Sequence, residues 1–544
     1  MSNAFKRIVA VLIACVAAMT SVVALWQSNA TEMDAQASRD FQRYSLEVIG
    51  TGVSSYAQLG FDFNRAYAAW EFFNQLALNA ERAGDQQSAA RYRSLAERMR
   101  AFSPLLQSPY FDQASQTSDL TRYTAERVLI DLARLNELFT AALRVREAWD
   151  NKTSAYAIHQ TLLSVSLFLL GLALTLTSRL MARLFAVLGV IIALLASAAA
   201  LGTWLTPVRD LRRVPNAIEA FVEGVSWSVR GEYEKAMEAL GRAIAAAPDY
   251  TEAYVQRAIA ADASGKPEQA IPDYEKARQL GSRSAQLAGA LAWAYARTYQ
   301  YEPALRLYEE ATRIDPNEIW AYFDLGLVRL VSGAPFEQVQ AAYDQAAALA
   351  VRLTAESRAS GGAPPSYLWN ALDDASIQLD RVVRTLRQGN SDDTVFPLET
   401  MRLTPEQAAP IEALSHRLKS LAVSLEYYGT PPAAAPTARF GTLQVTDSEG
   451  VERQSFSADT ATVWLEMTFS GARDGSDLVI KFFRNGVEES SLRIFKSWEH
   501  GIQGSARIEI AASEGSNVAF EVGDYVVELY LDGQFMASGR FRVE

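Results

Sequence analysis

The hydrophobic positions along this chain follow three patterns, and each pattern predicts a different kind of element. Uninterrupted apolar runs occur near the N-terminus and between residues 161 and 205. From about residue 214 to residue 428, apolar residues recur every three or four positions, which is the spacing of an amphipathic helix. After residue 439 they alternate with polar residues, as in a half-buried strand. We therefore expect a multi-domain, mainly helical chain with an all-β sandwich at its C-terminal end.

The apolar runs have the length of membrane spans. Ile8–Trp26 contains no charged residue and can cross a hydrocarbon core of about 30 Å. Thr161–Ser178 and Leu184–Leu205 are separated only by the stretch RLMAR, and they predict a tight transmembrane hairpin. A buried soluble hairpin is the alternative for this pair. We expect three membrane helices, which makes the lipid bilayer a partner of the chain.

The first apolar run has two other interpretations. A cleaved signal peptide begins in the same way, but its apolar region is shorter, about 7 to 15 residues. The sequence LIAC, which ends at Cys15, matches a lipoprotein cleavage site, although the run stays apolar well beyond it. An uncleaved anchor is therefore favoured.

Positive residues beside the spans predict the orientation in the membrane. Lys6 and Arg7 favour a cytoplasmic N-terminus, and Arg179 and Arg183 then fall on the same side. Three crossings place everything after Leu205 outside the cytoplasm. A second set of positive residues, in longer segments, favours the opposite orientation: Arg144, Arg146, Lys152, Arg209, Arg212 and Arg213. Since the Ala-rich composition suits a bacterium, we expect a bacterial plasma (inner) membrane protein with extracytoplasmic C-terminal domains.

The segment between the first and second spans is polar overall but carries apolar residues at helical spacing, such as Trp70, Phe73 and Leu76. It predicts three or four helices, the last of them continuous with the second membrane helix. The stretch AAWEFFNQLALNAERAGD resembles the aromatic-rich insert of a bacterial three-helix membrane family of unknown function, and this resemblance implies no activity. A sensing bundle and a packed spacer are both compatible with the pattern.

An internal repeat follows the third span. Ala236, Ala270 and Ala304 lie 34 residues apart, and a second set of alanines keeps the same step. The period and the residue types resemble the tetratricopeptide repeat (TPR), which implies an α-solenoid of helical pairs. A fourth unit runs one residue late, which an insertion in the turn at Ala334–Phe336 explains. Small residues let the paired helices approach closely. The residues assigned to this packing are Gly224, Gly231, Ala236, Ala243, Ala270, Ala277, Ala304, Ala311, Gly326 and Gly333.

By the same resemblance, the first helices of the repeats line a concave groove that holds a peptide or protein partner. An apolar groove with two tryptophans suits a hydrophobic segment better than an acidic tail. The alternative is that these side chains pack against neighbouring helices. The expected groove residues are Phe221, Val225, Val255, Ile259, Asp262, Trp293, Arg297, Trp320, Phe323 and Leu327.

Two helical stretches after the repeats are expected to cap the solenoid, and a Pro/Ala linker then leads to the β-domain. RNG at Arg484–Gly486 and LDG at Leu531–Gly533 are two-residue hairpin signals. The ending GDYVVELYLDGQFMASGRFRVE resembles the terminal hairpin of immunoglobulin-like modules on bacterial extracytoplasmic proteins. The boundaries expected are 1–29 (first membrane helix), 30–155 (helical insert), 156–206 (membrane hairpin), 214–352 (solenoid), 353–428 (cap), 429–438 (linker) and 439–544 (sandwich).

Composition removes several classes of function. A net charge of −12 argues against nucleic-acid binding, which needs a basic surface. The single cysteine and three dispersed histidines, His159, His416 and His500, predict no metal site. Motifs for nucleophiles or phosphate loops are missing, and no cofactor is expected. Asp373 and Asp374 are adjacent on a helix, so we expect both to be solvated rather than to act as a pair.

These observations together favour a non-enzymatic, membrane-anchored scaffold or adaptor that binds a protein partner through a TPR groove and a β-sandwich. The alternative is a membrane signalling or transport accessory protein whose helical insert senses a ligand.

Overall fold

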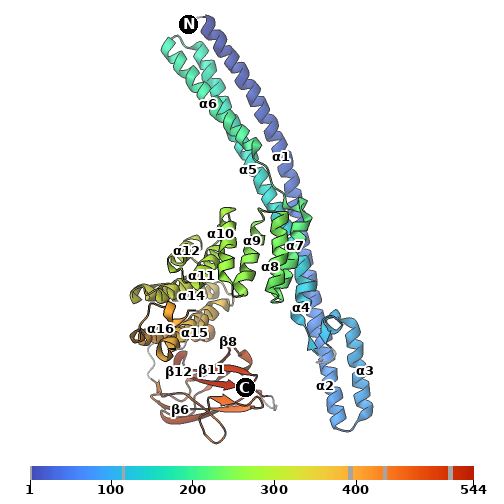
Figure 1. The fold of residues 1–544 in the computed structure, drawn as a ribbon, viewed down its shortest axis with the longest axis vertical. Coiled ribbons are helices and arrows are strands. Elements are labelled where there is room, and N and C mark those ends of the chain that lie inside the picture. Colours follow the sequence, from blue (N-terminus) through green and yellow to red (C-terminus); the bar gives the residue numbers. More distant parts are fainter. Residues whose placement is uncertain (1–2, 113–116, 390–395, 433–437, 513–518) are drawn as a thin grey trace. The chain divides into compact units, whose positions relative to one another are not determined.

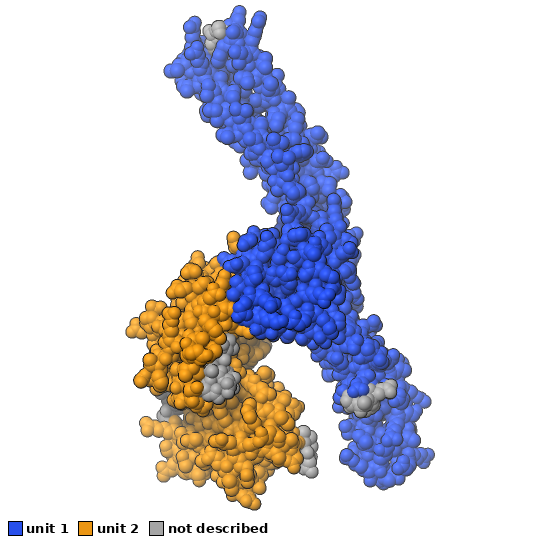
Figure 2. All heavy atoms as spheres, in the orientation of Figure 1, with its two compact units in different colours: residues 1–280 blue, residues 281–544 orange. Residues whose placement is uncertain are grey.

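The computed structural model describes residues 3–112, 117–389, 396–432, 438–512 and 519–544. Helices dominate as far as residue 428 and strands form the C-terminal part, so the predicted fold class is confirmed (Figure 1). The chain divides into two compact units, residues 1–280 and 281–544 (Figure 2). The centre of the predicted Pro/Ala linker, residues 433–437, lies outside the described residues.

Three helices of the first unit are long and apolar enough to cross a membrane, by length and composition alone. They contain α1 (Asn3–Gly60), α5 (Ile130–Thr175) and α6 (Arg179–Leu205). As predicted, the last helix of the insert is continuous with the second apolar run.

Helix α1 also continues far beyond its apolar run, because no glycine or proline interrupts residues 27–49. The turn of the hairpin lies at residues 176–178, and RLMAR forms the first turn of α6 instead of the loop.

Small residues bring α5 and α6 together. The Ser166 hydroxyl on α5 donates a 2.7 Å hydrogen bond to the carbonyl oxygen of Gly189 on α6. A Cβ atom on Gly189 would lie 3.0 Å from Leu170 Cγ, so a larger residue there would push the helices apart. At the other end of the three apolar runs, the rings of Trp26 and Trp204 stack with their centroids 5.7 Å apart.

The insert is built around aromatic side chains. The ring of Trp70 meets Phe111 edge-on with centroids 5.1 Å apart, in a small core that also contains Leu106. Two segments of π-helix interrupt the long helices here. The elements are η1 (Phe61–Tyr67), α2 (Ala68–Arg82), α3 (Gln86–Phe102), η2 (Pro104–Leu106), β1 (Phe111–Asp112), β2 (Thr117–Ser118), α4 (Leu120–Thr124) and η3 (Ala125–Leu129).

The tetratricopeptide-like repeat is confirmed as four helical pairs, two in each unit. The first unit contains η4 (Leu211–Arg213), α7 (Pro215–Val229) with α8 (Tyr233–Ala246), and α9 (Thr251–Ala263) with α10 (Pro267–Gln279). The second unit contains α11 (Ala285–Arg297) with α12 (Tyr301–Ile314), and α13 (Ile319–Val331) with α14 (Phe336–Ala359).

Close helix contacts explain the small residues of the repeat. All six repeat alanines are fully buried. A Cβ atom on Gly224 would lie 2.5 Å from Leu240 Cγ, and one on Gly326 would lie 2.6 Å from Tyr343 Cε2. Gly231 and Gly333 sit in the turns with φ of +74° and +79°, a conformation that favours glycine.

Two further helices, α15 (Tyr367–Gln388) and α16 (Ala408–Tyr427), contact the last repeat pair. Their connection includes η5 (Leu398–Thr400) and η6 (Pro405–Gln407). The Arg358 guanidinium donates to the Tyr428 carbonyl at 2.7 Å, and the Arg402 amide donates to the Val331 carbonyl at 2.9 Å.

The C-terminal region consists of two mainly antiparallel sheets around one core, in which Trp498 and Phe482 are fully buried. One sheet has the order β10-β6-β3, with β4 also on β6; the other has the order β5-β12-β11-β7-β8, with β9 also on β7. The strands are β3 (Arg439–Phe440), β4 (Gln444–Thr446), β5 (Ser455–Phe456), β6 (Thr462–Ser470), β7 (Asp477–Arg484), β8 (Val487–Glu488), β9 (Ile494–Ser497), β10 (Gln503–Ala511), β11 (Gly523–Leu531) and β12 (Gln534–Val543), with η7 (Ser490–Leu492) before β9.

Candidate functional site

The outer face of the six-stranded sheet is partly covered by α15 and α16, and two buried lysines lie at this contact. Lys481 on β7 is fully buried, with its Nζ atom 3.0 Å from Asp373 Oδ2 and 2.9 Å from Glu426 Oε2. These acids come from α15 and α16, so the ion pairs join both helices to the sheet. Burial raises the pKa of Asp373 to about 7, although the Lys481 charge opposes this shift. The expectation that Asp373 is solvated is therefore wrong.

Lys419 on α16 forms the second buried bridge. Its Nζ atom lies 2.7 Å from Asp380 Oδ2 on α15 and 2.5 Å from Glu528 Oε1 on β11. Burial opposes the charge of Lys419, but Glu528 and Asp380 outweigh this effect and raise its pKa. The Tyr530 hydroxyl donates to the other oxygen of Glu528. Both acids therefore have partners at the point where helix and sheet separate.

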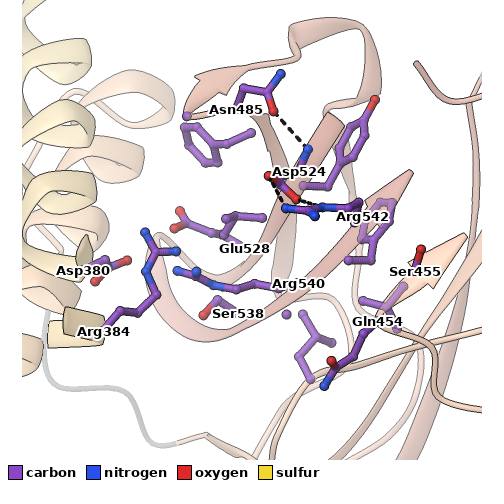
Figure 3. Close-up of a pocket in the computed structure, with 18 of the residues that line it drawn as sticks. Asp380, Arg384, Gln454, Ser455, Asn485, Asp524, Glu528, Ser538, Arg540 and Arg542 are labelled. Atoms are coloured by element: carbon purple, nitrogen blue, oxygen red, sulfur yellow. Dashed lines mark hydrogen bonds and ion pairs between the residues drawn. The ribbon is translucent and has the colours of Figure 1, made fainter. Parts of the chain in front are cut away.

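A polar cleft of about 940 Å³ opens beside this bridge, between α15 and the uncovered part of the sheet (Figure 3). Helix α15 supplies Asp380, Arg381 and Arg384 to one wall. The other wall comes from the outward-facing positions of β11 and β12 and from the loop before β5. Among its polar residues are Gln454, Ser455, Asn485, Asp524, Glu528, Ser538, Arg540 and Arg542.

The carboxylates that line this cleft are already engaged by other groups of the chain. Asp524 binds the Arg542 guanidinium, with one N–O distance of 2.9 Å. The side-chain oxygen of Asn485 accepts a hydrogen bond from the backbone N–H of Asp524 at 3.0 Å. The backbone N–H of Asn485 donates to the backbone carbonyl of Asp524 at 2.8 Å. Ser455 donates to Glu544, and the Gln444 amide donates to Glu452. These carboxylates therefore already have partners within the chain.

Arg384 and Arg540 project into the cleft from opposite walls, with their guanidinium groups turned toward one another (Figure 3). Arg540 is exposed, and within the described part of the chain no acidic side chain is paired with it. Arg540 can therefore donate hydrogen bonds to a negatively charged group that enters the cleft.

The predicted groove residues are found in different environments. Phe221, Phe323 and Leu327 are buried within their units. The ring of Phe221 lies 5.1 Å from that of Tyr250, so it packs in the repeat interior. Ile259 is 42% exposed, and the remaining residues are half-buried: Val225, Val255, Asp262, Trp293, Arg297 and Trp320.

The two groove tryptophans make contacts inside the second unit. The Trp320 ring covers Gly289 on α11, where an added Cβ atom would lie 2.3 Å from the ring. Trp293 meets the buried Phe396 edge-on, with centroids 5.8 Å apart. Phe396 belongs to the connection between α15 and α16, which the sequence pattern did not place near α11. Much of the apolar surface of both tryptophans is therefore used for packing.

The cleft was not predicted from the sequence. Its residues come from segments up to about 170 positions apart, and neither their types nor their spacing match a known motif. One local signal was present: Ser538, Arg540 and Arg542 alternate with buried residues in β12, so they share the outer face of the sheet.

No family model and no curated protein matches this chain. Among solved structures, MamA from Desulfovibrio magneticus RS-1 is 18% identical and covers 28% of this chain and 83% of its own, with a TM-score of 0.24. YrrB, described as a TPR protein with an unusual peptide-binding site, is 18% identical and covers 31% and 82%, with a TM-score of 0.24. A tetratricopeptide repeat protein from Parabacteroides merdae is 13% identical and covers 64% and 99%, with a TM-score of 0.25. Likeness at this level does not assign a family.

Proposed function

We propose that this protein is a membrane-anchored adaptor that holds a protein partner on its TPR-like repeats. One observation supports this most strongly: the first repeats pack on α5, the helix that continues into the second apolar run. Arg134 on α5 binds Glu219 on α7 through two bonds of 2.8 Å, and Arg144 on α5 pairs with Glu252 on α9. The first two repeats are thereby held at a fixed place on a helix that also has the composition of a membrane span.

The ends of the apolar runs support the membrane anchor. Lys6, Arg7, Arg179 and Arg183 flank the runs at one end. At the other end, Trp26 contacts both Trp204 and Tyr156. Aromatic residues gather at the interface between lipid and water, and positive residues remain on the cytoplasmic side. This distribution favours a cytoplasmic N-terminus and extracytoplasmic repeats, in the plasma membrane of a bacterium.

The partner surface is proposed to include Val255 and Ile259, which lie one helical turn apart on the first helix of the second repeat. Ile259 is a large apolar residue with 42% of its surface exposed. A hydrophobic segment of a partner protein would remove this surface from water, which is favourable by about 25 cal/mol per Å². The side chains buried in the repeat interiors support the shape of this surface and do not themselves face the partner.

A photo-crosslinking amino acid at position 259 tests the adaptor proposal in intact cells. We expect a discrete crosslinked protein whose yield saturates as the adaptor is overexpressed. The matched control is position 238, an exposed residue on the second helix of the first repeat, where we expect no such product. If positions 259 and 238 yield the same products, the repeats do not hold a specific partner.

A second candidate function is ligand sensing by the insert, and one feature favours it. Asp62 is fully buried in η1, where its Oδ2 atom accepts bonds from Gln58 and Tyr123. Within the described residues, its Oδ1 atom has no hydrogen-bond partner. Gln58 and Tyr123 also line a cavity of about 470 Å³. Segments of π-helix such as η1 and η3 are frequent at functional sites.

The sensing function can be separated from the adaptor function with Asp62→Asn, which keeps the size of the side chain. Loss of a cellular response with unchanged crosslinking at position 259 would favour sensing. An unchanged response would leave Asp62 with a structural role only.

A further inference from the structure

Helix α1 carries exposed apolar side chains well beyond its apolar run. Leu46, Ile49, Val53 and Tyr56 are 62–73% exposed, and we call these four residues the α1 stripe. Leu46 follows Trp26 by 20 residues, which is about 30 Å along a helix, so lipid around the first apolar run would not reach the stripe. A large apolar surface in this position needs a cover other than lipid.

The spacing of the α1 stripe is that of a seam between two helices. Its members follow one another at steps of three, four and three residues, which gives the average step of about 3.5 found in such seams. Helix α5 lies along another face of α1 (Figure 1). There the rings of Phe41 and Phe139 have centroids 5.1 Å apart, and a Cβ atom on Gly52 would lie 4.0 Å from Leu132. Helix α5 therefore leaves the stripe exposed.

Small residues flank the α1 stripe. Gly50 and Ala57 lie beside it on the exposed side of α1. Glycine inside a helix is less favourable than alanine, and a Cβ atom on Gly50 would meet no atom within 4 Å. No contact within the described chain therefore requires a glycine there. The close approach of a helix from another molecule would account for it.

We propose that the α1 stripe binds the α1 stripe of a second copy of this chain. This goes beyond the adaptor function but rests on the membrane anchor proposed above, which fixes the direction of the helices. Two copies inserted in one membrane have parallel α1 helices, with Leu46 and Val53 at the same heights in both. Each residue of the stripe then meets its own counterpart across a two-fold axis.

The charges along α1 are compatible with such a pair. In a parallel pair in register, a charged residue in the seam would face an equal charge and be repelled. Between Tyr44 and Asp62 the sole charged residue is Glu47, which is turned by about 100° from Leu46 around the helix. Glu47 also lies 3.9 Å from Arg43 of the same helix. The seam is therefore free of like charges.

The area of the α1 stripe is sufficient for a pair held in a membrane. The exposed parts of its side chains amount to on the order of 500 Å² per copy, so two copies would bury about 1,000 Å², the lower limit for a specific interface. Each α1 helix is already formed along α5, so pairing requires no new helix. A shared membrane also raises the effective concentration of one copy near another.

A cysteine scan of the full chain in its native membrane tests the pairing. Single cysteines replace residues 46–56, one at a time, in a Cys15→Ser background, and copper phenanthroline oxidises those that meet. Leu46→Cys and Val53→Cys should each give at least about tenfold more of a product with the mass of two chains than the control Glu47→Cys, because a disulfide requires close Cβ atoms. Equal yields at positions 46, 47 and 53, or a product that contains a different protein, overturn the proposal.

Opposite charges at position 53 test direct contact. Val53→Glu places two carboxylates opposite one another and should weaken pairing by about tenfold or more, as measured by native mass spectrometry of the full chain in nanodiscs. Val53 is exposed in the single chain, so the variant should fold. Mixing Val53→Glu with a differently tagged Val53→Lys should restore pairing, whereas the control Glu47→Lys should leave pairing unchanged. Full pairing of Val53→Glu alone, or no restoration in the mixture, overturns the contact.

Carbonate extraction of the same membranes distinguishes failure of the pair from failure of the anchor. A chain that stays in the membrane but gives no linked product overturns the pair alone. A chain that carbonate releases contradicts the anchor, and with it the parallel register of α1. Crosslinking from position 259 should be the same in Val53→Glu as in the parent, which separates the pair from the adaptor function.

Discussion

The hydroxyl of Tyr250 donates a 2.7 Å hydrogen bond to Glu137 Oε2, and both side chains are buried. Tyr250 precedes α9, whereas Glu137 belongs to α5, so this bond joins the second repeat to the helix that continues toward the membrane. Removing one partner of a buried hydrogen bond leaves the other unsatisfied, at a cost of about 1–3 kcal/mol. Tyr250→Phe should therefore increase hydrogen exchange in α9 while α6 remains unchanged. Equal exchange in the variant and the parent would contradict this role of the bond.

Stability at this contact should depend on pH. Burial raises the pKa of Glu137 from 4.5 to about 7, although the bond from Tyr250 opposes the shift. A carboxyl group with a raised folded-state pKa binds more protons in the folded state, so its stabilising effect is complete below pH 4.5 and is lost as pH rises toward 7. The loss is on the order of 3 kcal/mol at most.

Hydrogen exchange in α9, corrected for the intrinsic rate, should thus become faster between pH 5 and 7. The control is Glu137→Gln, which cannot titrate and should remove this dependence. A pH dependence that persists in Glu137→Gln would assign it to other groups.

Replacing a helical glycine by alanine should have opposite effects on stability at two positions, Gly326 and Gly241. In Gly326→Ala the new methyl group meets the Tyr343 ring at 2.6 Å, and overpacking of this kind costs about 1–3 kcal/mol. In Gly241→Ala the nearest atom outside α8 is Arg257 Nη1 at 3.7 Å, so alanine should stabilise α8 by about 0.5–1 kcal/mol. Exchange should increase in α13 for the first variant and decrease in α8 for the second. Decreased exchange in both variants would show that close approach at Gly326 is unimportant, and increased exchange in both would contradict the prediction for Gly241.

Gly326 illustrates what the sequence could predict. The 34-residue step depends on contacts between helices that are neighbours in the chain, so Ala236 and Gly224 signal their packing through spacing alone. The ion pairs of Lys481 depend on three elements that are distant in sequence, and no local pattern encodes their meeting. The adjacent positions of Asp373 and Asp374 on one helix suggested that both are solvated. That argument missed the sheet, which is distant in sequence and covers Asp373. The residues of the cleft around Arg540 also come from segments that are distant in sequence, so their spacing could not predict it.

Lys481 should be essential for the contact between the sheet and the two helices that cover it. Lys481→Met removes a fully buried cation and leaves Asp373 and Glu426 without it, which should destabilise the contact by about 3–5 kcal/mol. Exchange should rise in both β7 and α15. Glu426 keeps its ion pair with Arg493, so Asp373 is the acid left uncompensated. Adding Asp373→Asn removes that acid, and the double variant should therefore recover part of the loss. A double variant as unstable as the sum of the two single variants would contradict a direct pairing.

The proposed orientation can be tested with single cysteines in a Cys15→Ser background, since Cys15 is the only native cysteine. Ser448 is exposed in the C-terminal domain, and Ser178 is exposed in the turn between α5 and α6. With a cytoplasmic N-terminus and three crossings, a membrane-impermeant maleimide should label Ser448→Cys in intact spheroplasts and should label Ser178→Cys only after permeabilisation.

The reverse labelling pattern would mean that the arginines after the third span, Arg209, Arg212 and Arg213, determine the cytoplasmic side. The repeats would then face cytosolic partners, and the search for the partner would move to cytosolic proteins. Labelling of both positions from outside would contradict the hairpin itself, because Ser178 and Ser448 are separated by one crossing, α6, and must lie on opposite sides if that helix spans the membrane.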